Sequence, residues 1–235
     1  MSKDWTKIRA KVKDFIESEI YPKETELAKG TPEAREMLGS LMQLAKDEKI
    51  WALGHPEDIG GGGMPFMEYV YVNEVIGRSS FAMVALGTHS LQDSIMLREF
   101  ASPHWRDQYL EPLVQGEIFP SFGMTEPDVA SSDPTQLQTT AILENGTWKI
   151  NGTKWFTTGA ARAAYTTVMC RTELDAPSHG AFSMIIVPTD NPGYKIVRET
   201  PVLGINGGHY EVKYDNVEVP EENLLGPRGQ GFIIA

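Results

Sequence analysis

The spacing of the apolar residues changes near residue 118, and this change constrains the fold more than any other feature. Upstream, from Trp5 to Leu113, apolar residues recur every three or four positions, as in amphipathic helices. Downstream, short apolar runs are separated by Gly, Pro and Asn-Gly pairs, which are typical of strands and tight turns. The sequence predicts an α+β protein in which an all-α domain precedes an antiparallel β-barrel or sandwich-like domain. We place the boundary at residues 117–121.

Two helix starts carry specific signals. The first helix is expected to begin at Asp4 or Ser2 and to end or kink at Pro22, because proline lacks the amide that a helix needs. The second is expected at Thr31, followed by Pro32 in its first turn. Three more helices are predicted over residues 65–76, 80–100 and 103–115.

Four consecutive glycines, Gly60 to Gly63, suggest a phosphate-binding loop at first sight. No Gly-Lys-Ser/Thr follows, and no strand of a βαβ unit precedes them. We interpret the stretch as backbone that packs closely against a neighbour or a ligand.

The second half contains two Asn-Gly pairs, Asn145-Gly146 and Asn151-Gly152, beside short strand-like runs. Asn-Gly is the strongest local signal for a hairpin turn, so we expect two hairpins here. Further strands are predicted over residues 164–171, 181–188, 194–197 and 208–219, with prolines between the runs.

Composition excludes several classes of protein. The chain has 21 basic and 32 acidic residues, a net charge of −11, which argues against nucleic-acid binding. The histidines show no zinc-binding spacing, so no metal site is expected. No apolar run is long enough for a membrane span. The single cysteine, Cys170, is expected to be buried and inert and fits a reducing compartment, such as the cytoplasm or, in a eukaryote, the mitochondrial matrix.

Two separated motifs point to a cofactor. The first is Phe122-Gly-Met-Thr-Glu-Pro-Asp-Val-Ala-Ser-Ser-Asp133, and the second is Lys154-Trp-Phe-Thr-Thr-Gly-Ala160. Each places hydroxyls and backbone amides beside an aromatic ring, which suits a flat heterocycle that forms hydrogen bonds. Together, in this order, they resemble the signature of the acyl-CoA dehydrogenase family, Tyr/Phe-x-Met/Val-Thr-Glu-Pro, small residues and Ser-Asp, then Lys-x-Trp-Ile-Thr-Asn.

The resemblance implies that FAD is the cofactor and assigns its contacts. Phe156 stands where the family has the tryptophan that covers the flavin face, Thr157 replaces an apolar residue, and Thr158 matches the threonine beside the reactive flavin nitrogen. Gly159 replaces a common asparagine. The full set of expected cofactor-binding residues is Phe122, Met124, Thr125, Ser131, Phe156, Thr157 and Thr158.

The resemblance also implies substrate contacts. Ser132 aligns with the family serine near the thioester of the acyl-CoA, although an extra residue in this segment leaves the choice between Ser131 and Ser132 open. His179 lies in a stretch that aligns with a loop near coenzyme A. Glu126 and Asp133 are interpreted as structural, Asp133 holding its own turn.

The implied function is flavin-dependent oxidation of an acyl-CoA thioester to the 2,3-enoyl-CoA, as in fatty acid β-oxidation. The resemblance covers the N-terminal helical domain (1–118) and the middle β-domain (119–226), with residues 227–235 as the start of a C-terminal helical bundle. The family base lies in that bundle, so we nominate no catalytic residue and expect a truncated, inactive chain. The expected partners of the parent enzyme are an acyl-CoA substrate, an electron-transfer flavoprotein and identical subunits in a dimer or tetramer.

Two alternatives remain open at this stage. The chain could be a non-catalytic module that binds FAD or acyl-CoA, or an interaction protein on the same scaffold. It could also derive from an acyl-CoA oxidase or a flavin monooxygenase of the same fold, in which oxygen would rapidly reoxidise the reduced flavin.

Overall fold

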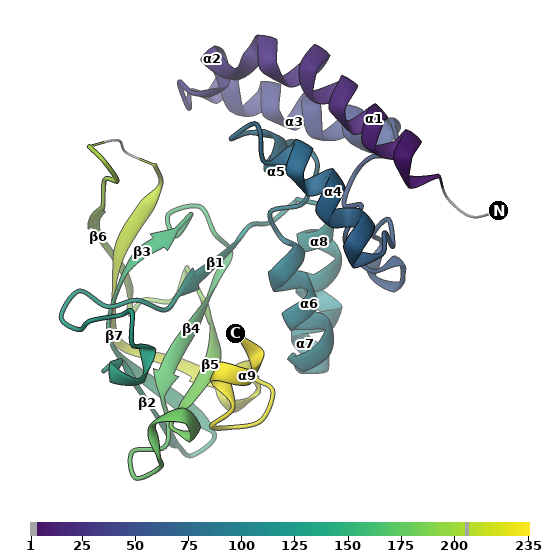
Figure 1. The fold of residues 1–235 in the computed structure, drawn as a ribbon. Helices are drawn as coiled ribbons and strands as arrows, with labels where there is room; N and C mark the ends of the chain where they lie inside the picture. Colours follow the sequence, from purple (N-terminus) through teal and green to yellow (C-terminus); the bar gives the residue numbers. More distant parts are fainter. Residues whose placement is uncertain (1–3, 205–206) are drawn as a thin grey trace. The chain divides into compact units, whose positions relative to one another are not determined.

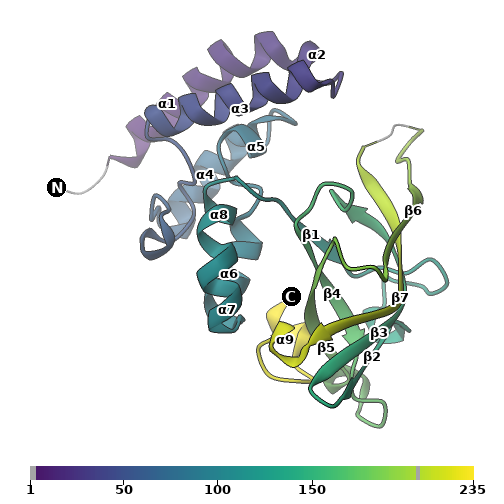
Figure 2. The same cartoon turned by 180° about the vertical axis from the view of Figure 1, so that it is seen from behind.

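The computed structural model describes residues 4–204 and 207–235, which form two compact units (Figures 1 and 2). One unit holds the residues up to 95 together with 114–117, and the other holds 96–113 together with the residues from 118 onward. The apolar spacing alone put residues 96–113 with the other helices. The structure groups them with the sheet, where the buried Trp105 indole lies 3.3 Å from the Asn223 side chain.

The first unit begins with α1 (Trp5–Phe15), whose N-cap is Asp4, which accepts a hydrogen bond from the Lys7 amide at 3.3 Å. Ser2, the other predicted cap, lies outside the described residues. A π-helical turn (Ile16–Ile20) and a 3₁₀ turn (Tyr21–Lys23) that contains Pro22 lead into α2 (Glu24–Leu27). The expected interruption at Pro22 is therefore a local change of helix type.

The next helices follow the sequence signals with one exception. The helix α3 (Pro32–Asp47) begins at Thr31, whose hydroxyl accepts from the Ala34 amide at 3.3 Å, and α4 spans Phe66–Ile76. The prediction of a single helix over residues 80–100 is wrong, because the chain forms two helices there, α5 (Ala82–Ala85) and α6 (Leu91–Phe100). Gly87 lies between them at a φ of +68°, a backbone conformation that interrupts a helix.

The helical stretch predicted over 103–115 consists of three consecutive pieces. They are α7 (Pro103–Trp105), a π-helical turn (Arg106–Leu110) and α8 (Glu111–Val114). Gly116 follows at a φ of +71°, as expected of a residue that ends a helix.

The four-glycine stretch folds back onto the residues before it. The amides of Gly62 and Gly63 donate to the carbonyl oxygens of Ala52 and His55, each at 2.9 Å. His55 is fully buried, and burial lowers the pKa of its imidazole to about 4. The backbone hydrogen bonds of Gly62 and Gly63 show that the glycines permit close backbone packing, in agreement with the interpretation from sequence.

Substitution of Gly61 by Ala is expected to destabilise the first unit by about 1–3 kcal/mol, because a Cβ there would overpack the turn. That Cβ would lie 2.2 Å from the His55 carbonyl oxygen. Gly39→Ala is the matched control, since a Cβ at Gly39 in α3 meets no atom within 4 Å. Urea unfolding should show Gly39→Ala to be neutral or stabilising. Equal effects of the two substitutions would contradict the packing assigned to Gly61.

The second unit is built on one mixed sheet (Figure 1). Its strand order is β6-β7-β3-β2-β4-β5-β8, with β1 beside β4. Most neighbouring strands are antiparallel, as predicted, but β1 and β2 each pair with β4 in parallel, so the sheet is mixed rather than wholly antiparallel. The strands are β1 (Pro120–Gly123), β2 (Thr140–Glu144), β3 (Thr147–Thr158), β4 (Tyr165–Arg171), β5 (Phe182–Pro188), β6 (Tyr194–Glu199), β7 (His209–Pro220) and β8 (Leu224–Leu225).

Only one of the two Asn-Gly pairs makes a hairpin. Asn145 and Gly146 both have positive φ and connect β2 to β3, as predicted. Asn151-Gly152 instead lies inside β3, where the pairing with β7 shifts register. A Cβ at Gly152 would lie 2.3 Å from the Thr139 hydroxyl, so glycine serves close approach here and the predicted second hairpin is wrong.

Apolar side chains form two clusters in the sheet unit. One gathers Trp105, Tyr165 and Phe182 with neighbouring residues, and the other gathers Trp148, Ile150 and Val212 with theirs. Cys170 belongs to the second cluster and is fully buried, which raises the pKa of its thiol to about 12. The thiol is therefore protonated at neutral pH and inert, as the sequence suggested.

The last residues pack on the same unit. The helix α9 (Gly231–Ile234) lies on β5, and a Cβ at Gly231 would come within 2.7 Å of the Met169 sulfur. The Gly229 amide donates to the buried Ser183 hydroxyl at 2.8 Å. Among the described residues, no helix has the length and apolarity needed to cross a membrane.

Candidate functional site

A buried ion pair joins the two motifs. The Lys154 ammonium on β3 lies 2.8 Å from the Glu126 carboxylate, and their side chains are 0% and 5% exposed. Lys154 also donates to the Met124 carbonyl at 2.7 Å. Glu126 accepts two backbone N–H bonds, from Gln138 at 2.7 Å and Thr139 at 2.9 Å. The pair therefore fixes the loop that follows β1 to the strand that carries the second motif.

Each residue of this pair stabilises the charged form of the other. Burial alone would raise the pKa of Glu126, but the Lys154 ammonium and the N–H donors outweigh it, and the pKa is lowered below its usual value. Burial lowers the pKa of Lys154, and the Glu126 carboxylate opposes that shift. Glu126 is an ionised structural anchor, which agrees with the sequence interpretation.

The two motifs are also linked through their backbones. The Thr125 hydroxyl donates to the Trp155 carbonyl at 2.9 Å, and the Trp155 amide donates to the Thr125 carbonyl at 3.0 Å. The proton of the Thr125 hydroxyl is thus used within the protein, and its oxygen lone pairs remain for a ligand. Phe122 and Met124, also expected at the cofactor, are partly buried against the cluster around Trp105.

Phe156 lies at an irregularity of β3. The pairing of β3 with β7 shifts register between Lys154 and Thr157, and Phe156 adopts a φ of +50°. The residue is 43% exposed, and the centre of its ring lies 4.8 Å from that of the Trp155 ring. A positive φ in an aromatic residue is strained, and such strain is typical of functional sites.

The two threonines after Phe156 have different surroundings. Thr157 is fully buried, whereas Thr158 is exposed like Phe156. The Thr157 hydroxyl has no hydrogen-bond partner among residues 4–204 and 207–235. Thr157 is thus directed into the core, whereas Phe156 and Thr158 are both accessible to a ligand at this irregularity of the strand.

The structure adds His209, which the sequence interpretation did not include. Its Nδ1 lies 2.9 Å from the Thr158 hydroxyl, and Ser121 donates to the Thr158 carbonyl at 2.8 Å. His209 and Thr158 are partners across the β3–β7 ladder. A local motif could not reveal this contact, since 51 residues separate the pair.

The two serines of the first motif have different surroundings. Ser131 accepts from the Glu126 amide at 2.9 Å and donates to the Glu126 carbonyl at 3.1 Å, so it closes the loop. Ser132 is exposed. Asp133 accepts from the amide and the hydroxyl of Thr135 at 3.1 and 2.6 Å and holds its own turn, as interpreted from sequence.

His179 is exposed in a 3₁₀ turn (Ser178–Gly180), and its ring lies 6.2 Å from that of Phe232. This turn packs against the 3₁₀ turn Pro134–Gln136. The structure thus brings His179 near the turn that follows Ser132.

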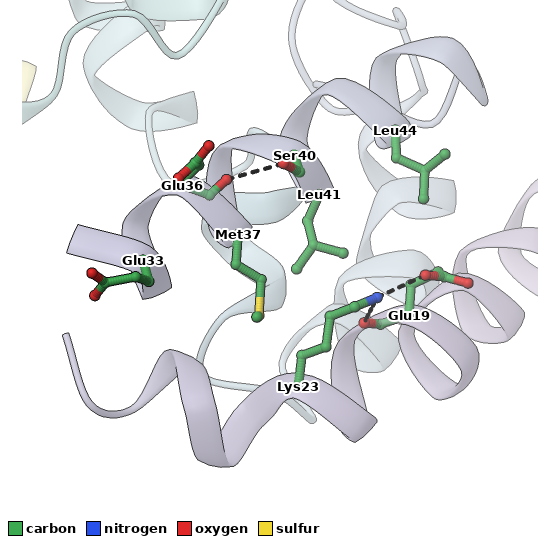
Figure 3. A pocket seen from close by; sticks show the side chains of 8 residues that line it. All are labelled: Glu19, Lys23, Glu33, Glu36, Met37, Ser40, Leu41 and Leu44. Carbon is green, nitrogen blue, oxygen red and sulfur yellow. Dashed lines mark hydrogen bonds and ion pairs between the residues drawn. The ribbon is translucent and has the colours of Figure 1, made fainter. Parts of the chain in front are cut away.

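Two hollows lie away from the motifs. One, of about 360 Å³, lies beside α3, from which Met37 and Leu41 point toward Lys23 and Glu19 (Figure 3). Another, of about 420 Å³, lies in the sheet unit and is lined by residues such as His104, Tyr109 and Asn191. Neither is lined by a predicted site residue. Within the described part of the chain, no three His, Cys, Asp or Glu residues gather as a metal site would require.

The motif residues fit a flat heterocycle. An exposed aromatic ring offers a stacking face, and an exposed hydroxyl follows two residues further along the strand. The buried Lys154–Glu126 pair fixes the strand that carries these two side chains, and the two charges neutralise each other rather than a ligand. The arrangement can position a ring and form hydrogen bonds to it.

Comparisons with known proteins agree along nearly the whole chain. Residues 2–117 match the family model of the acyl-CoA dehydrogenase N-terminal domain, and residues 121–217 match that of the acyl-CoA dehydrogenase middle domain. The probable acyl-CoA dehydrogenase FadE2 of Mycobacterium tuberculosis is 38% identical over 241 residues, which cover 97% of this chain and 58% of that protein.

Solved structures show the same fold. A Mycobacterium abscessus protein whose solved structure is assigned as an acyl-CoA dehydrogenase shares 32% sequence identity with this chain. The two structures superpose with a TM-score of 0.90 over 99% of this chain and 62% of the Mycobacterium abscessus chain. An acyl-CoA dehydrogenase from Bacillus anthracis, solved in complex with FAD, is 26% identical with a TM-score of 0.78, over 100% of this chain and 39% of that one. The chain thus spans less than two thirds of the length of each of these proteins.

Proposed function

The chain belongs to the acyl-CoA dehydrogenase family, and from that premise we propose that it forms the flavin-contacting part of an enzyme that oxidises an acyl-CoA thioester to the 2,3-enoyl-CoA. Its helical and sheet parts, about 1–118 and 119–226, would be the N-terminal and middle domains of that enzyme. The observation that carries the proposal is the exposed pair Phe156 and Thr158, held beside Thr125 by the buried Lys154–Glu126 bridge.

The residues of the second motif would hold the cofactor in distinct ways. Phe156 stacks on the ring, and the Thr158 hydroxyl forms a hydrogen bond at its edge, while Thr157 supports the strand from the core side. Phe122, Met124, Thr125 and Ser131 shape the adjacent loop. The chemistry that a bound flavin supplies is the acceptance of a hydride. The protein supplies orientation and electrostatics, and we assign no catalytic base within this chain.

The proposed contact with the substrate is made by Ser132, which is exposed. Ser131 already closes the loop with Glu126, so Ser132 is the serine that is available to the thioester end of the acyl-CoA. A hydrogen-bond donor at that end stabilises the negative charge that develops on the carbonyl oxygen. His179, near the same turn, is our candidate for a contact with coenzyme A.

The remaining expectations belong to the whole enzyme. We propose an electron-transfer flavoprotein as its electron acceptor, a dimer or tetramer as its assembly, and the cytoplasm, or the mitochondrial matrix of a eukaryote, as its compartment. The buried, protonated thiol of Cys170 is compatible with a reducing compartment.

The visible spectrum of the purified chain with FAD tests the proposal. After removal of free FAD, we expect a retained flavin band and, on anaerobic addition of acyl-CoAs of several chain lengths, a perturbed band that shows the thioester beside the ring. Complete bleaching would mean that the chain carries a base and is active by itself. Retained FAD that no acyl-CoA perturbs would favour the non-catalytic module, rapid reoxidation by oxygen after bleaching would favour an oxidase, and loss of all flavin would contradict a cofactor site in this chain.

A further inference from the structure

The exposed hydroxyl of Thr158 has a titratable partner on the next strand. The two atoms, Thr158 Oγ1 and His209 Nδ1, are 2.9 Å apart, and the residues oppose each other in the β3–β7 ladder. Thr158 is exposed and His209 is half-buried. The imidazole therefore lies directly behind the hydroxyl that the proposed function turns toward the flavin.

We propose that His209 is a positioning residue that sets whether the Thr158 hydroxyl donates or accepts a hydrogen bond at the flavin. The proposal rests on the proposed function, because it requires that the flavin lies beside Thr158. It adds to that function a residue outside both sequence motifs.

The Thr158 hydroxyl carries a single proton, which it can donate to only one partner at a time. When Nδ1 of His209 carries no proton, it accepts the Thr158 O–H, and the hydroxyl can only accept from a ligand. When Nδ1 carries a proton, it donates to Thr158 Oγ1, and the hydroxyl proton is free for the ligand. The reactive nitrogen of oxidised flavin is an acceptor, whereas that of the fully reduced flavin is an N–H donor. A protonated Nδ1 therefore suits the oxidised flavin, to which the hydroxyl can donate. An unprotonated Nδ1 suits the reduced flavin, from which the hydroxyl can accept.

The backbone around His209 is fixed on both sides. Its carbonyl accepts from the Thr200 amide at 2.8 Å, and the preceding Gly208 carbonyl accepts from the Gly159 amide at 2.8 Å. The Glu199 carboxylate on β6 accepts from the Gly208 amide at 3.0 Å. These bonds hold the imidazole against Thr158, so a change in its protonated nitrogen changes the hydroxyl rather than the loop.

Two charged groups lie near the glycines that adjoin this pair in the sequence. Glu199, from β6, is engaged by the Gly208 amide. Arg162 follows β3, and its Nε lies 3.9 Å from the position of a Cβ on Gly159. Thr158, which faces the imidazole from β3, is itself neutral. A pH profile of the site must therefore be compared with those of variants at His209 itself.

The first test uses the chain without FAD. Nitrogen NMR of ¹⁵N-histidine-labelled protein, well above pH 6.5 where an imidazole is neutral, reports which ring nitrogen carries the proton. Thr158→Val should change the tautomer ratio of His209 about three- to tenfold, the range expected for loss of one hydrogen bond. Thr158→Ser should restore it, and the exposed His104 in the same spectrum should not change. An unchanged His209 ratio in Thr158→Val would overturn the proposal.

The second test uses the FAD-loaded chain and reads the flavin midpoint potential. His209→Leu removes both arrangements and should change the ratio of affinities for reduced and oxidised flavin about three- to tenfold. A tenfold change is about 30 mV for a two-electron couple. His209→Asn, which can donate or accept without titrating, should restore the potential but remove the part of its pH dependence that His209 contributes, and His104→Ala is the control.

The outcomes separate the two proposals. If the wild-type chain retains no FAD, the proposed function fails and the role of His209 fails with it. If the chain retains FAD but His209→Leu leaves the potential and its pH profile unchanged, only the role of His209 is overturned. A changed potential in His209→Leu, with an unchanged one in His104→Ala, supports both.

Discussion

Replacement of Lys154 by Met is expected to lower the free energy of unfolding of the sheet unit by about 3–5 kcal/mol, because it leaves the Glu126 carboxylate buried without its counter-charge. Lys154 and Glu126 are 2.8 Å apart and 0% and 5% exposed, so water cannot compensate for the loss. The Met124 carbonyl also loses its donor. Urea unfolding followed by circular dichroism measures the effect.

Lys149→Met is the matched control, since Lys149 on the same strand forms an exposed ion pair with Glu218 at 3.7 Å. Its loss should cost about 0–1 kcal/mol. The double variant Lys154→Met with Glu126→Gln should recover much of the stability, because no buried charge remains. Equal costs for Lys154→Met and Lys149→Met would show that the buried pair does not anchor the loop.

The same pair predicts a loss of stability in acid. The folded-state pKa of Glu126 lies below its ordinary value of 4.5. A carboxylate with a lowered pKa stabilises the fold fully above the unfolded value, and this stabilisation is lost as the pH falls through the folded value. The stability difference between wild type and Glu126→Gln should therefore shrink below about pH 4.5. A difference that stays constant down to pH 3 would contradict the assigned charge state.

Replacement of Phe156 by Ala is expected to weaken FAD binding about thirtyfold, or about 2 kcal/mol, because the ring loses its stacking face. The side chain is 43% exposed in the free chain, so it is available to a ligand and adds little to the core. Quenching of FAD fluorescence in a titration measures the dissociation constant.

Phe156→Trp is the informative partner variant, since Trp is the residue that the family carries at this position. It should bind FAD at least as tightly as wild type. Ile142→Ala serves as a control, because Ile142 is a 37% exposed apolar residue on β2, outside both motifs. Weakening by Ile142→Ala as large as that by Phe156→Ala would place the cofactor elsewhere on the sheet.

Local signals in the sequence predicted much of this fold. The Thr31 cap, the Asn145-Gly146 hairpin and the change from helices to strands near residue 118 are each decided by neighbours in the chain. Asn151-Gly152 carries the same turn signal but lies inside β3, because pairing with β7 and the close approach of Thr139 outweigh it. Local preference is overridden where long-range pairing is strong.

The sequence motifs locate the residues of the proposed site but not the contacts between them. The motifs identified Phe156 and Thr158, and the resemblance gave them roles. Sequence could not show that Thr157 faces the core, since the register shift after Lys154 is a property of the β3–β7 pairing. The contact between Thr158 and His209 depends on the same pairing.

The most direct measurement is an NMR titration of the ¹⁵N-labelled, assigned chain with FAD. If the two motifs form the flavin site, amide shifts should change first and most at residues 122–125 and 155–159, with smaller changes at His209. The hollow around His104 and Tyr109 should remain unaffected, although it belongs to the same unit. Changes confined to that hollow, or the absence of any change at saturating FAD, would contradict the flavin site proposed for this chain.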